Sequence, residues 1–273
     1  MNYRHIYHAG NFADVFKHWI LTLILSKLSK KTTPFCLFDT HAGLGFYDLQ
    51  DVNAQKTLEF KSGVARLLDK TVAPEFNDFI RLIIEYNRQY SAYPGSPAIM
   101  QAFMRATDRL ILSELHPADY QTLKHNFKDD RRITTLQQSG YATLKALLPP
   151  LERRGLILID PPFEKDDEFE QIIISIKESL KRFANGIYAI WYPIKDRKAI
   201  SQFYNNLEKT SAASILVIEL HANESILNQL NSCGMVVINP PWQLEETLKS
   251  AMPNLISYLN FNRGTFDLRA LKL

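Results

Sequence analysis

The sequence predicts an α/β domain built on a mostly parallel, seven-stranded sheet with helices on both faces. Seven short apolar, β-branched or aromatic runs stand out, at 34–40, 109–115, 132–138, 155–160, 186–192, 214–220 and 234–239. Segments with helical spacing lie between most of them, as at 166–183 and 195–209. Strands that alternate with helices in this way are typical of a parallel sheet covered on both faces.

The composition fits one large globular domain of 273 residues. Hydrophobic residues make up 46% of the chain and charged residues 22%, which is ordinary for such a domain. The net charge of +3 permits a nucleic-acid partner but does not require one. The two cysteines, Cys36 and Cys233, each lie inside an apolar run. We therefore expect reduced, buried thiols and no disulfide or zinc framework.

The N-terminal segment gives no sign of export or membrane insertion. Residues 1–19 lack the apolar core of a signal peptide, and the nearest apolar run, 19–25, is too short to span a bilayer. We therefore expect a cytoplasmic protein without a membrane partner.

Two features organise the first half of the chain. Residues 12–31 predict an amphipathic helix that ends in lysines, as a helix C-terminus favours. The long interval between the first and second strands exceeds what one crossover needs. It contains helical spacing at 75–90 and a turn sequence, YPGSP, at 93–97. We interpret 46–108 as a helical insertion subdomain on a single domain that spans 1–273.

Polar residues follow the first three strands. The first strand ends in Asp39 and runs into HAGLG, whose glycines let the backbone turn sharply near a ligand. An ordinary strand-to-helix turn explains this G-x-G equally well, because the third glycine of the dinucleotide fingerprint is missing. Glu114 ends the second strand, where an acid can accept hydrogen bonds from both hydroxyls of a ribose. Ser139 and Gly140, after the third strand, could meet an adenine ring.

The fourth strand ends in Asp160-Pro161-Pro162-Phe163. Two prolines fix φ and remove backbone donors, which holds the loop rigid with its carbonyl oxygens free to accept. Asp160 and one such carbonyl could accept both hydrogens of an exocyclic amine, and Phe163 offers a face for base stacking. Acceptors in that geometry favour a pyramidal nitrogen aligned with an electrophilic methyl group. A plain proline turn is the alternative interpretation.

A similar stretch, Asn239-Pro240-Pro241-Trp242, follows the seventh strand. In a seven-stranded sheet of this type we expect that strand to be antiparallel, so that its end lies at the opposite edge. We therefore interpret the stretch as structural, with Trp242 packed on the following helix.

The N-terminal polar residues and the basic clusters carry weaker signals. Histidines occur at 5, 8, 18 and 41, but no cysteine pair or H-E-x-x-H accompanies them, which argues against a metal. Tyr3, Arg4 and His5 form a polar, aromatic head that could stack on or clamp a nucleotide. Basic clusters occur at 27–31, 131–132, 153–154 and 181–182; such clusters are usually solvated faces, but they could contact phosphates.

The order of these motifs resembles that of Rossmann-like class I methyltransferases, which use S-adenosylmethionine to modify exocyclic amines of nucleic-acid bases. Longer stretches narrow the resemblance: residues 3–18, 39–43, 93–97, 114–117, 153–163, 186–193 and 238–242. They resemble the bacterial RlmJ family, formerly called YhiR, of 23S rRNA adenine N6-methyltransferases. The resemblance covers nearly the whole chain.

The resemblance implies a function and a set of site residues. Members of the family methylate N6 of one adenine in naked or partly assembled 23S rRNA, and they work as monomers without a metal. Asp160 is implied as the catalytic acceptor of the amine, with Lys17 near the reaction centre. Substrate contacts are implied for Tyr3, His5, Pro161 and Phe163, and cofactor contacts for His18, His41, Ser96, Glu114, Ser139, Gly140 and Asp160. Residues 46–108 would help to grip RNA.

Two positions depart from the family pattern. The family commonly has an acid where this chain has Ser139, and a hydroxyl accepts from an adenine amine more weakly than a carboxylate does. DPPF replaces the commoner DPPY, which keeps the aromatic face and loses only a hydroxyl.

Three other functions remain open at this stage. A DNA adenine N6-methyltransferase is the nearest alternative, because the chemistry of DPPF does not distinguish ribose from deoxyribose. A nicotinamide oxidoreductase is a second enzyme class, although DPPF has no role there. A non-catalytic ribosome-assembly factor would be favoured if no cofactor bound.

Overall fold

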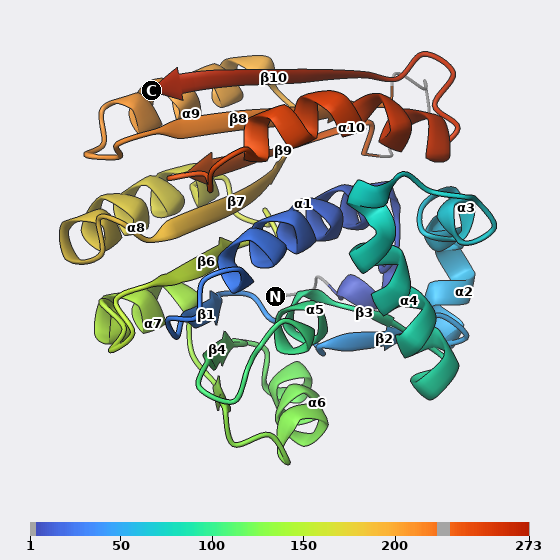
Figure 1. Cartoon of the computed structure of the whole chain (residues 1–273), viewed down its shortest axis with the longest axis horizontal. Coiled ribbons are helices and arrows are strands. Elements are labelled where there is room, and N and C mark those ends of the chain that lie inside the picture. The colour runs from blue at the N-terminus through green and yellow to red at the C-terminus, as the bar shows by residue number, and fades with distance from the viewer. Residues whose placement is uncertain (1–3, 223–229, 273) are drawn as a thin grey trace.

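The structure is a computed structural model that describes residues 4–222 and 230–272, and its centre is a sheet of eight strands with helices on both faces (Figure 1). The strands of this sheet, in spatial order, are β5 (Ile133–Leu136), β4 (Arg109–Ser113), β1 (Cys36–Asp39), β6 (Gly155–Ile159), β7 (Ile187–Pro193), β9 (Ser232–Ile238), β8 (Ile215–His221) and β10 (Thr265–Lys272). The fold class predicted from the sequence is confirmed. Among the described residues, no helix is both long and apolar enough to cross a membrane.

Strand direction follows the prediction, but the strand count does not. The pairs β5–β4, β4–β1, β1–β6 and β6–β7 are parallel, whereas β9 is antiparallel to both β7 and β8. The prediction of seven strands is wrong by one, because β10 pairs antiparallel with β8 at the edge of the sheet. Its sequence, TFDLRALK, mixes charged and apolar residues and is largely exposed, so it lacks the continuous apolar signal of the buried strands.

Two hydrophobic cores lie on the two faces of the sheet. Successive residues of a strand point to opposite faces, and β1 shows this clearly: Leu37 belongs to one core and Phe38 to the other. The first core is covered by α1 (Phe12–Ser29), α5 (Ser96–Ala102), α6 (Pro117–Phe127) and α10 (Leu244–Tyr258), and the second by α7 (Gly140–Leu147), α8 (Glu168–Arg182) and α9 (Arg197–Glu208). Both cysteines are free and buried, as predicted.

The first helix, α1, lies at the centre of the molecule. The prediction that it is amphipathic is wrong. The side chain of Asn11 caps it by accepting a hydrogen bond from the Asp14 backbone N–H. Every residue from Phe12 to Leu25 is buried. One side of α1 faces the sheet, and the segment after β1 covers the other side, so almost no solvent-facing stripe remains. A helix that is apolar around most of its circumference is buried on all sides, and the charged residues buried in α1, Asp14 and Lys17, are paired with each other.

The segment 46–108 contains more than helices. Its elements are β2 (Phe46–Asp48), α2 (Val52–Thr57), α3 (Ala65–Leu68), α4 (Asn77–Tyr90), β3 (Ala92–Pro94) and α5, with short 3-10 turns at Glu59–Ser62 and Pro74–Phe76. β2 and β3 form a separate two-stranded antiparallel sheet, which the sequence did not predict. The expected YPGSP turn is the junction at Gly95, where β3 ends and α5 begins. α5 packs on β1 and β4, so the end of this segment forms part of the layer that covers the main sheet.

Candidate active site

The carboxyl ends of the parallel strands meet around one large cavity. Glu114 follows β4, Asp160 follows β6, and Ser139 lies between β5 and α7. All of the predicted site residues that the structure describes line this cavity: His5, Lys17, His18, His41, Ser96, Glu114, Ser139, Gly140, Asp160, Pro161 and Phe163. Its volume of about 1240 Å³ exceeds the roughly 300–1,000 Å³ typical of a small-molecule pocket. The cavity is therefore large enough for a cofactor and a second ligand.

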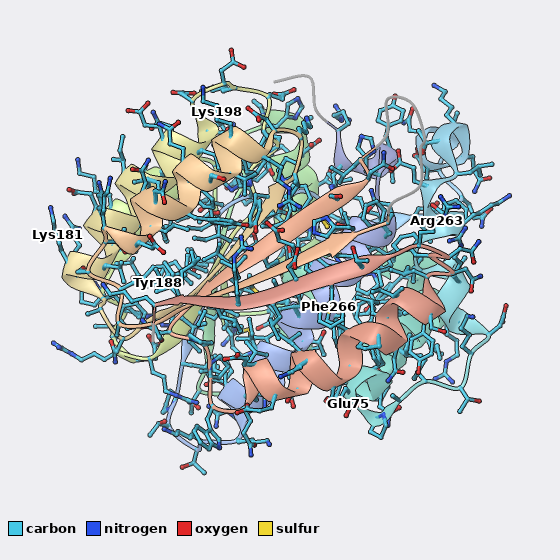
Figure 2. All side chains as sticks on the ribbon, turned by 90° about the horizontal axis from the view of Figure 1, so that it is seen from above. Glu75, Lys181, Tyr188, Lys198, Arg263 and Phe266 are labelled. Carbon is cyan, nitrogen blue, oxygen red and sulfur yellow. The ribbon has the colours of Figure 1, made fainter. Side chains whose placement is uncertain are left out.

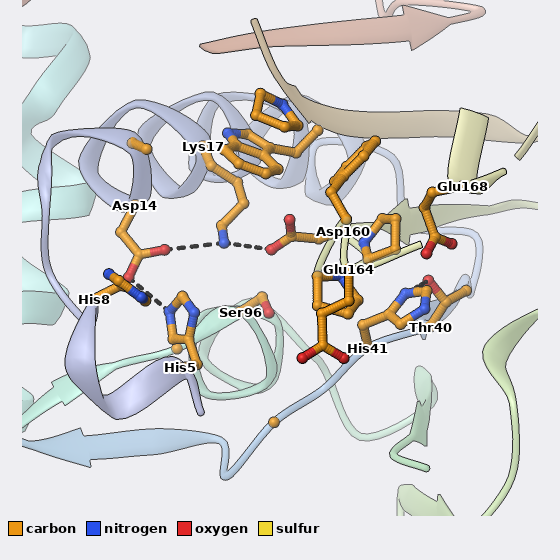
Figure 3. A pocket seen from close by; sticks show the side chains of 18 of the residues that line it. His5, His8, Asp14, Lys17, Thr40, His41, Ser96, Asp160, Glu164 and Glu168 are labelled. Carbon is orange, nitrogen blue, oxygen red and sulfur yellow. Dashed lines mark hydrogen bonds and ion pairs between the residues drawn. The ribbon is translucent and has the colours of Figure 1, made fainter. Parts of the chain in front are cut away.

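A buried ion triad lies at the centre of the cavity. Lys17, on α1, donates a hydrogen bond to Oδ2 of Asp160, and its Nζ lies 2.9 Å from Oδ1 of Asp14 (Figure 3). Burial lowers the pKa of Lys17, but the two carboxylates outweigh burial, so its pKa lies well above the usual value. Burial likewise opposes ionisation of Asp14, yet its cationic neighbours hold the pKa of this carboxyl well below the usual value. At neutral pH the triad therefore contains a charged lysine between its two acids.

The N-terminal segment is tied to this triad. His5 Nε2 lies 2.9 Å from Asp14 Oδ2, and the His5 ring packs on Tyr47 with centroids 5.0 Å apart. The same carboxylate oxygen accepts a hydrogen bond from the Gly10 backbone N–H. Asp14 thus joins α1, the residues that precede it and Lys17. Tyr3, which was predicted to contact substrate, lies outside the described residues.

The glycine turn after β1 holds Glu114 in place. The backbone N–H of Gly43 donates to Glu114 Oε2 at 2.9 Å, and the N–H of His116 donates to Oε1 at 2.7 Å. Gly43 has φ +59, and a Cβ there would lie 2.2 Å from the hydroxyl oxygen of Tyr47, so any other residue would be strained and would displace the Tyr47 side chain. Burial raises the pKa of Glu114. Each carboxylate oxygen has a second lone pair, so Glu114 can still accept from a ligand.

Asp39 ends β1 with one carboxylate oxygen unpaired. The His41 backbone N–H donates to Oδ1 at 3.2 Å, while Oδ2 is buried without a hydrogen-bond partner in the described structure. Burial raises the pKa of Asp39 to about 6, although the neighbouring Ser96 hydroxyl partly opposes this. Ser96 lines the cavity next to it. An orphaned buried carboxylate oxygen suits a cationic ligand group such as an ammonium.

Both predicted cofactor histidines are neutral. Burial lowers the pKa of His18 to about 3 and that of His41 to about 4. His18 Nδ1 lies 2.7 Å from the hydroxyl oxygen of Tyr93. The Thr40 hydroxyl donates to the carbonyl of Leu158, so at its 2.8 Å contact with His41 it accepts from Nδ1–H. His41 Nε2 is therefore left as an acceptor.

The β5–α7 junction forms one wall of the cavity. Ser139 is the N-cap residue of α7, but its side chain makes no capping hydrogen bond. A Cβ on Gly140 would lie 2.3 Å from the carbonyl oxygen of Thr40, so this close approach requires glycine. Together with the orphaned oxygen of Asp39 and the acceptors of Glu114, these residues fit a nucleoside with a cationic amino-acid tail.

The DPPF loop places an aromatic ring against the cavity. Phe163 has φ +50, an uncommon conformation for a non-glycine residue that is often found at functional sites. Its ring packs on Phe169 and on Trp191, with centroids 5.0 and 6.0 Å apart. Pro161 and Phe163 thus lie beside Asp160 at the carboxyl edge of the sheet.

The second proline pair lies at the opposite edge, as predicted. Ile238, the last residue of β9, pairs with Tyr188 near the start of β7. The side chain of Asn239 donates to the carbonyls of Ala184 and Gly186, which precede β7. The prediction that Trp242 packs on the following helix is wrong, because its side chain is 83% exposed.

The basic clusters also lie away from the cavity. All four clusters precede strands of the parallel sheet, so they gather at the amino edge of the sheet. They are Lys27–Lys31, Arg131–Arg132, Arg153–Arg154 and Lys181–Arg182. Lys181 is visible at the outer end of α8 (Figure 2). Arg132 is bound to Asp130, and Arg154 to the carbonyl of Thr33, so these two guanidinium groups are structural.

One group of side chains outside the cavity has the spacing of metal ligands. Glu219 and His221 on β8 and Asp267 on β10 bring one ligand atom each within 4.8 Å of one another. The guanidinium of Arg197 donates to Glu219 at 2.7 Å and pairs this buried carboxylate with a cation. This arrangement is a complete ion-pair network as it stands.

Three residues, two lining the cavity and one buried beside it, were missed or left without a role. Asp14 precedes Lys17 by three positions, and this helical spacing is a signal that could have paired them. Asp39 was recognised only as the end of a strand. Glu168 lies in an acidic run that has the appearance of a solvated helix start, so only the tertiary structure reveals that it faces the cavity.

The chain was compared with known families, proteins and structures. A model of the family described as "Ribosomal RNA large subunit methyltransferase D, RlmJ" matches residues 32–270. Two proteins named ribosomal RNA large subunit methyltransferase J, from Haemophilus influenzae and Escherichia coli, are 44% and 43% identical to the chain. Each match covers 95% of this chain and 94% of the relative. A crystal structure of a Legionella pneumophila protein is 36% identical with a TM-score of 0.89, covering 96% of this chain and 98% of that one.

Proposed function

The chain belongs to the ribosomal RNA large subunit methyltransferase J (RlmJ) family, and on this basis we propose that it methylates the N6 amine of one adenine in 23S rRNA. It is an rRNA methyltransferase of the class that uses S-adenosylmethionine. The observation that carries the adenine N6 assignment is Asp160. This carboxylate lies at a strand end inside the cavity, between the ammonium of Lys17 and the rigid Pro161–Pro162 pair.

Asp160 and the loop after it are proposed to bind and orient the amine. Lys17 occupies Oδ2 of Asp160, which leaves Oδ1 to accept a hydrogen bond from the amine. A loop carbonyl accepts the second hydrogen, and Phe163 stacks on the base. The nitrogen lone pair is delocalised into the ring when the amine is planar. Two acceptors out of that plane favour a pyramidal nitrogen, whose lone pair is then available for bond formation.

The cofactor is proposed to lie across the strand ends. S-adenosylmethionine supplies an electrophilic methyl group when it is bound. Its ammonium suits the unpaired oxygen of Asp39, next to Ser96. Its ribose hydroxyls suit Glu114, and its adenine ring suits the Ser139–Gly140 wall. His18 and His41, both neutral, line the cavity without adding charge repulsion against a cationic ligand.

Lys17 and His5 are proposed to lie at the end of the cavity where the target adenosine binds. The positive charge of Lys17 fixes the orientation of the Asp160 carboxylate, so that the amine meets an acceptor already in position. His5 and the preceding Tyr3 would contact the target adenosine. The segment 46–108 would help to grip RNA, since Tyr47 and Ser62 line the same cavity. We further propose a monomer without a metal, acting in the cytoplasm on naked or partly assembled 23S rRNA.

Nucleoside mass spectrometry of rRNA tests this function. Total 23S rRNA is compared from cells with the gene, without it, and without it but complemented by Asp160→Asn. We expect one N6-methyladenosine to disappear in the deletion and to stay absent with the variant. An unchanged level of N6-methyladenosine in the deletion would overturn the proposal.

A substrate competition separates RNA from DNA. Purified protein is given equimolar 23S rRNA fragments and a DNA oligonucleotide of the same sequence, with radiolabelled S-adenosylmethionine. We expect label in the RNA alone. Preferential labelling of the DNA would favour the DNA adenine N6-methyltransferase.

A further inference from the structure

Glu168 is a buried carboxylate that faces the cavity, and the proposed reaction gives it no role. It is the first residue of α8, and only 7% of it is exposed. Acidic side chains are almost never buried to this extent unless they are paired. Its Oε1 accepts a hydrogen bond of 2.7 Å from the hydroxyl of Tyr141. Within residues 4–222 and 230–272, Oε2 accepts no hydrogen bond.

The position of Glu168 assigns it to one end of the cavity. Tyr141 directly follows Gly140 at the start of α7, so its hydroxyl links Glu168 to the Ser139–Gly140 wall. The Tyr141 ring also meets His41 edge-on, with centroids 5.6 Å apart. In Figure 3, Glu168 lies with Thr40 and His41 on one side of Asp160, whereas Asp14 and His5 lie on the other. Glu168 therefore faces away from the proposed entry of the target base.

We propose that Glu168 Oε2 accepts a hydrogen bond from the exocyclic amine of the cofactor's adenine ring, and thereby selects that base. This inference rests on the proposed use of S-adenosylmethionine. The amine offers only donors, and an ionised carboxylate offers only acceptors. Ser139, which stands where an acid is expected, has a hydroxyl that both donates and accepts. Ser139 alone therefore cannot distinguish an amine from a carbonyl at this position.

Tyr141 is the positioning residue for this contact. Burial raises its pKa, and the neighbouring Glu168 raises it further, so the phenol remains protonated and donates. This hydrogen bond restricts Glu168 to one orientation and occupies Oε1. The remaining oxygen is then available in the cavity without a further loss of side-chain freedom on binding.

The chemistry predicts a specific discrimination. Hypoxanthine differs from adenine by a carbonyl oxygen in place of the amine, and this oxygen would face the carboxylate of Glu168. A hydrogen bond would be lost, and an acceptor would be placed against an acceptor. Losing one charge-assisted hydrogen bond corresponds to an affinity loss of about 10- to 100-fold.

Titration calorimetry with two product analogues tests the inference. S-adenosylhomocysteine and S-inosylhomocysteine are titrated into the wild-type protein, Glu168→Gln and the control Glu170→Gln, which changes an exposed acid on the same helix. We expect the wild type and the control to prefer the adenosyl compound by about 10- to 100-fold. Glu168→Gln should lose most of this preference, because its amide can donate to a carbonyl. It can still accept from Tyr141, and its unfolding temperature serves as the check on folding.

The outcomes separate this inference from the proposed function. An unchanged preference in Glu168→Gln, with the adenosyl compound bound tightly, would overturn the role of Glu168 and leave the methyltransferase intact. A wild type that binds neither compound would overturn the proposed cofactor, and the role of Glu168 with it. Tyr141→Phe adds a second measurement: it should weaken binding of the adenosyl compound but not reverse the preference, and a reversal would contradict the positioning role.

Discussion

Buried Lys17 and half-buried Asp160 form an ion pair although 143 positions separate them in the chain. The first helix supplies the cation and the loop after β6 supplies the anion. Because Lys17 also contacts Asp14, the pair is anchored to α1 and cannot shift independently of the fold. This contact connects the buried helix α1 to the proposed reaction centre.

Replacing Asp160 with Asn should nearly abolish methyl transfer. The amide cannot supply the same charged acceptor to the amine, and a loss of about 10²–10⁴-fold in kcat is expected. Steady-state transfer of radiolabelled methyl groups to 23S rRNA fragments measures it. Circular dichroism should show an unchanged fold. Wild-type kcat in the variant would contradict the role of Asp160.

Asn239→Ala provides the matched change in the other proline pair. It removes two hydrogen bonds to the carbonyls of Ala184 and Gly186, at a residue with φ +53. The free energy of unfolding should fall by about 1–3 kcal/mol, measured by urea denaturation. The kcat of the folded protein should be unchanged. A loss of kcat as deep as that of Asp160→Asn would mean that the catalytic proline pair is the one after Asn239 and not the one after Asp160.

Lys17→Met should separate stability from catalysis. It leaves Asp14 and Asp160 without their shared cation, and breaking such a buried pair costs about 3–5 kcal/mol. Adding Asp14→Asn removes one of the uncompensated charges, so the double variant should regain part of the lost stability. It should not regain activity, because Asp160 still lacks Lys17. Thermal unfolding and methyl transfer are measured on all three proteins, and recovered activity in the double variant would exclude a direct role for Lys17.

Cofactor binding should release a proton near pH 6. Burial raises the pKa of Asp39 from 3.8 to about 6, so the folded chain retains a proton there that the unfolded chain has lost. The contribution of Asp39 to stability is therefore fully present below the unfolded value and is lost as the pH rises through about 6. A ligand ammonium favours the ionised form, so affinity for S-adenosylhomocysteine should rise over the same window.

Calorimetry in two buffers of different ionisation enthalpy measures this release. At pH 6 about half a proton should leave per ligand bound, and none at pH 8. Asp39→Asn should abolish the difference between the buffers. Identical enthalpies in both buffers at pH 6 for the wild type would show that Asp39 does not meet the ammonium.

Lys195→Ala should weaken RNA binding in a salt-dependent way. Lys195 is exposed at the rim of the cavity, just after β7, where RNA flanking the target base would pass. Losing one phosphate contact should lower the slope of log affinity against log salt by about one, measured by fluorescence anisotropy. Lys181→Ala, at the amino edge, is the control and should leave the slope unchanged. Equal slopes in all three proteins would exclude Lys195 from the interface.

Much of the sheet and most of the proposed site were predictable from local patterns. Buried parallel strands are continuous apolar runs, and the polar residues directly after them, such as Glu114 and Asp160, fall at one edge by topology alone. β10 was missed because an edge strand needs no such run. The sequence of the helix at 12–31 predicts an amphipathic helix. Nothing in that local sequence indicates that the segment after β1 covers the outer side of the helix.

The remaining site residues depend on contacts distant in sequence. Asp14 matters because it shares Lys17 with Asp160, which arrives from the middle of the chain. Glu168 matters because Tyr141, on a different helix, holds it toward the cavity. Lys17 and Asp160 are 143 positions apart, and Tyr141 and Glu168 are 27 apart, so neither role could be read before the fold was known.

The burial of α1 also bears on how the protein is made. The helix is synthesised well before β9 and α10, which cover part of its surface. Until these elements emerge, that part of α1 stays exposed in the nascent chain, and such apolar surface is what chaperones bind and what aggregates when they are scarce. A chain truncated before β9 would leave that part of α1 uncovered and would be a substrate for proteolysis.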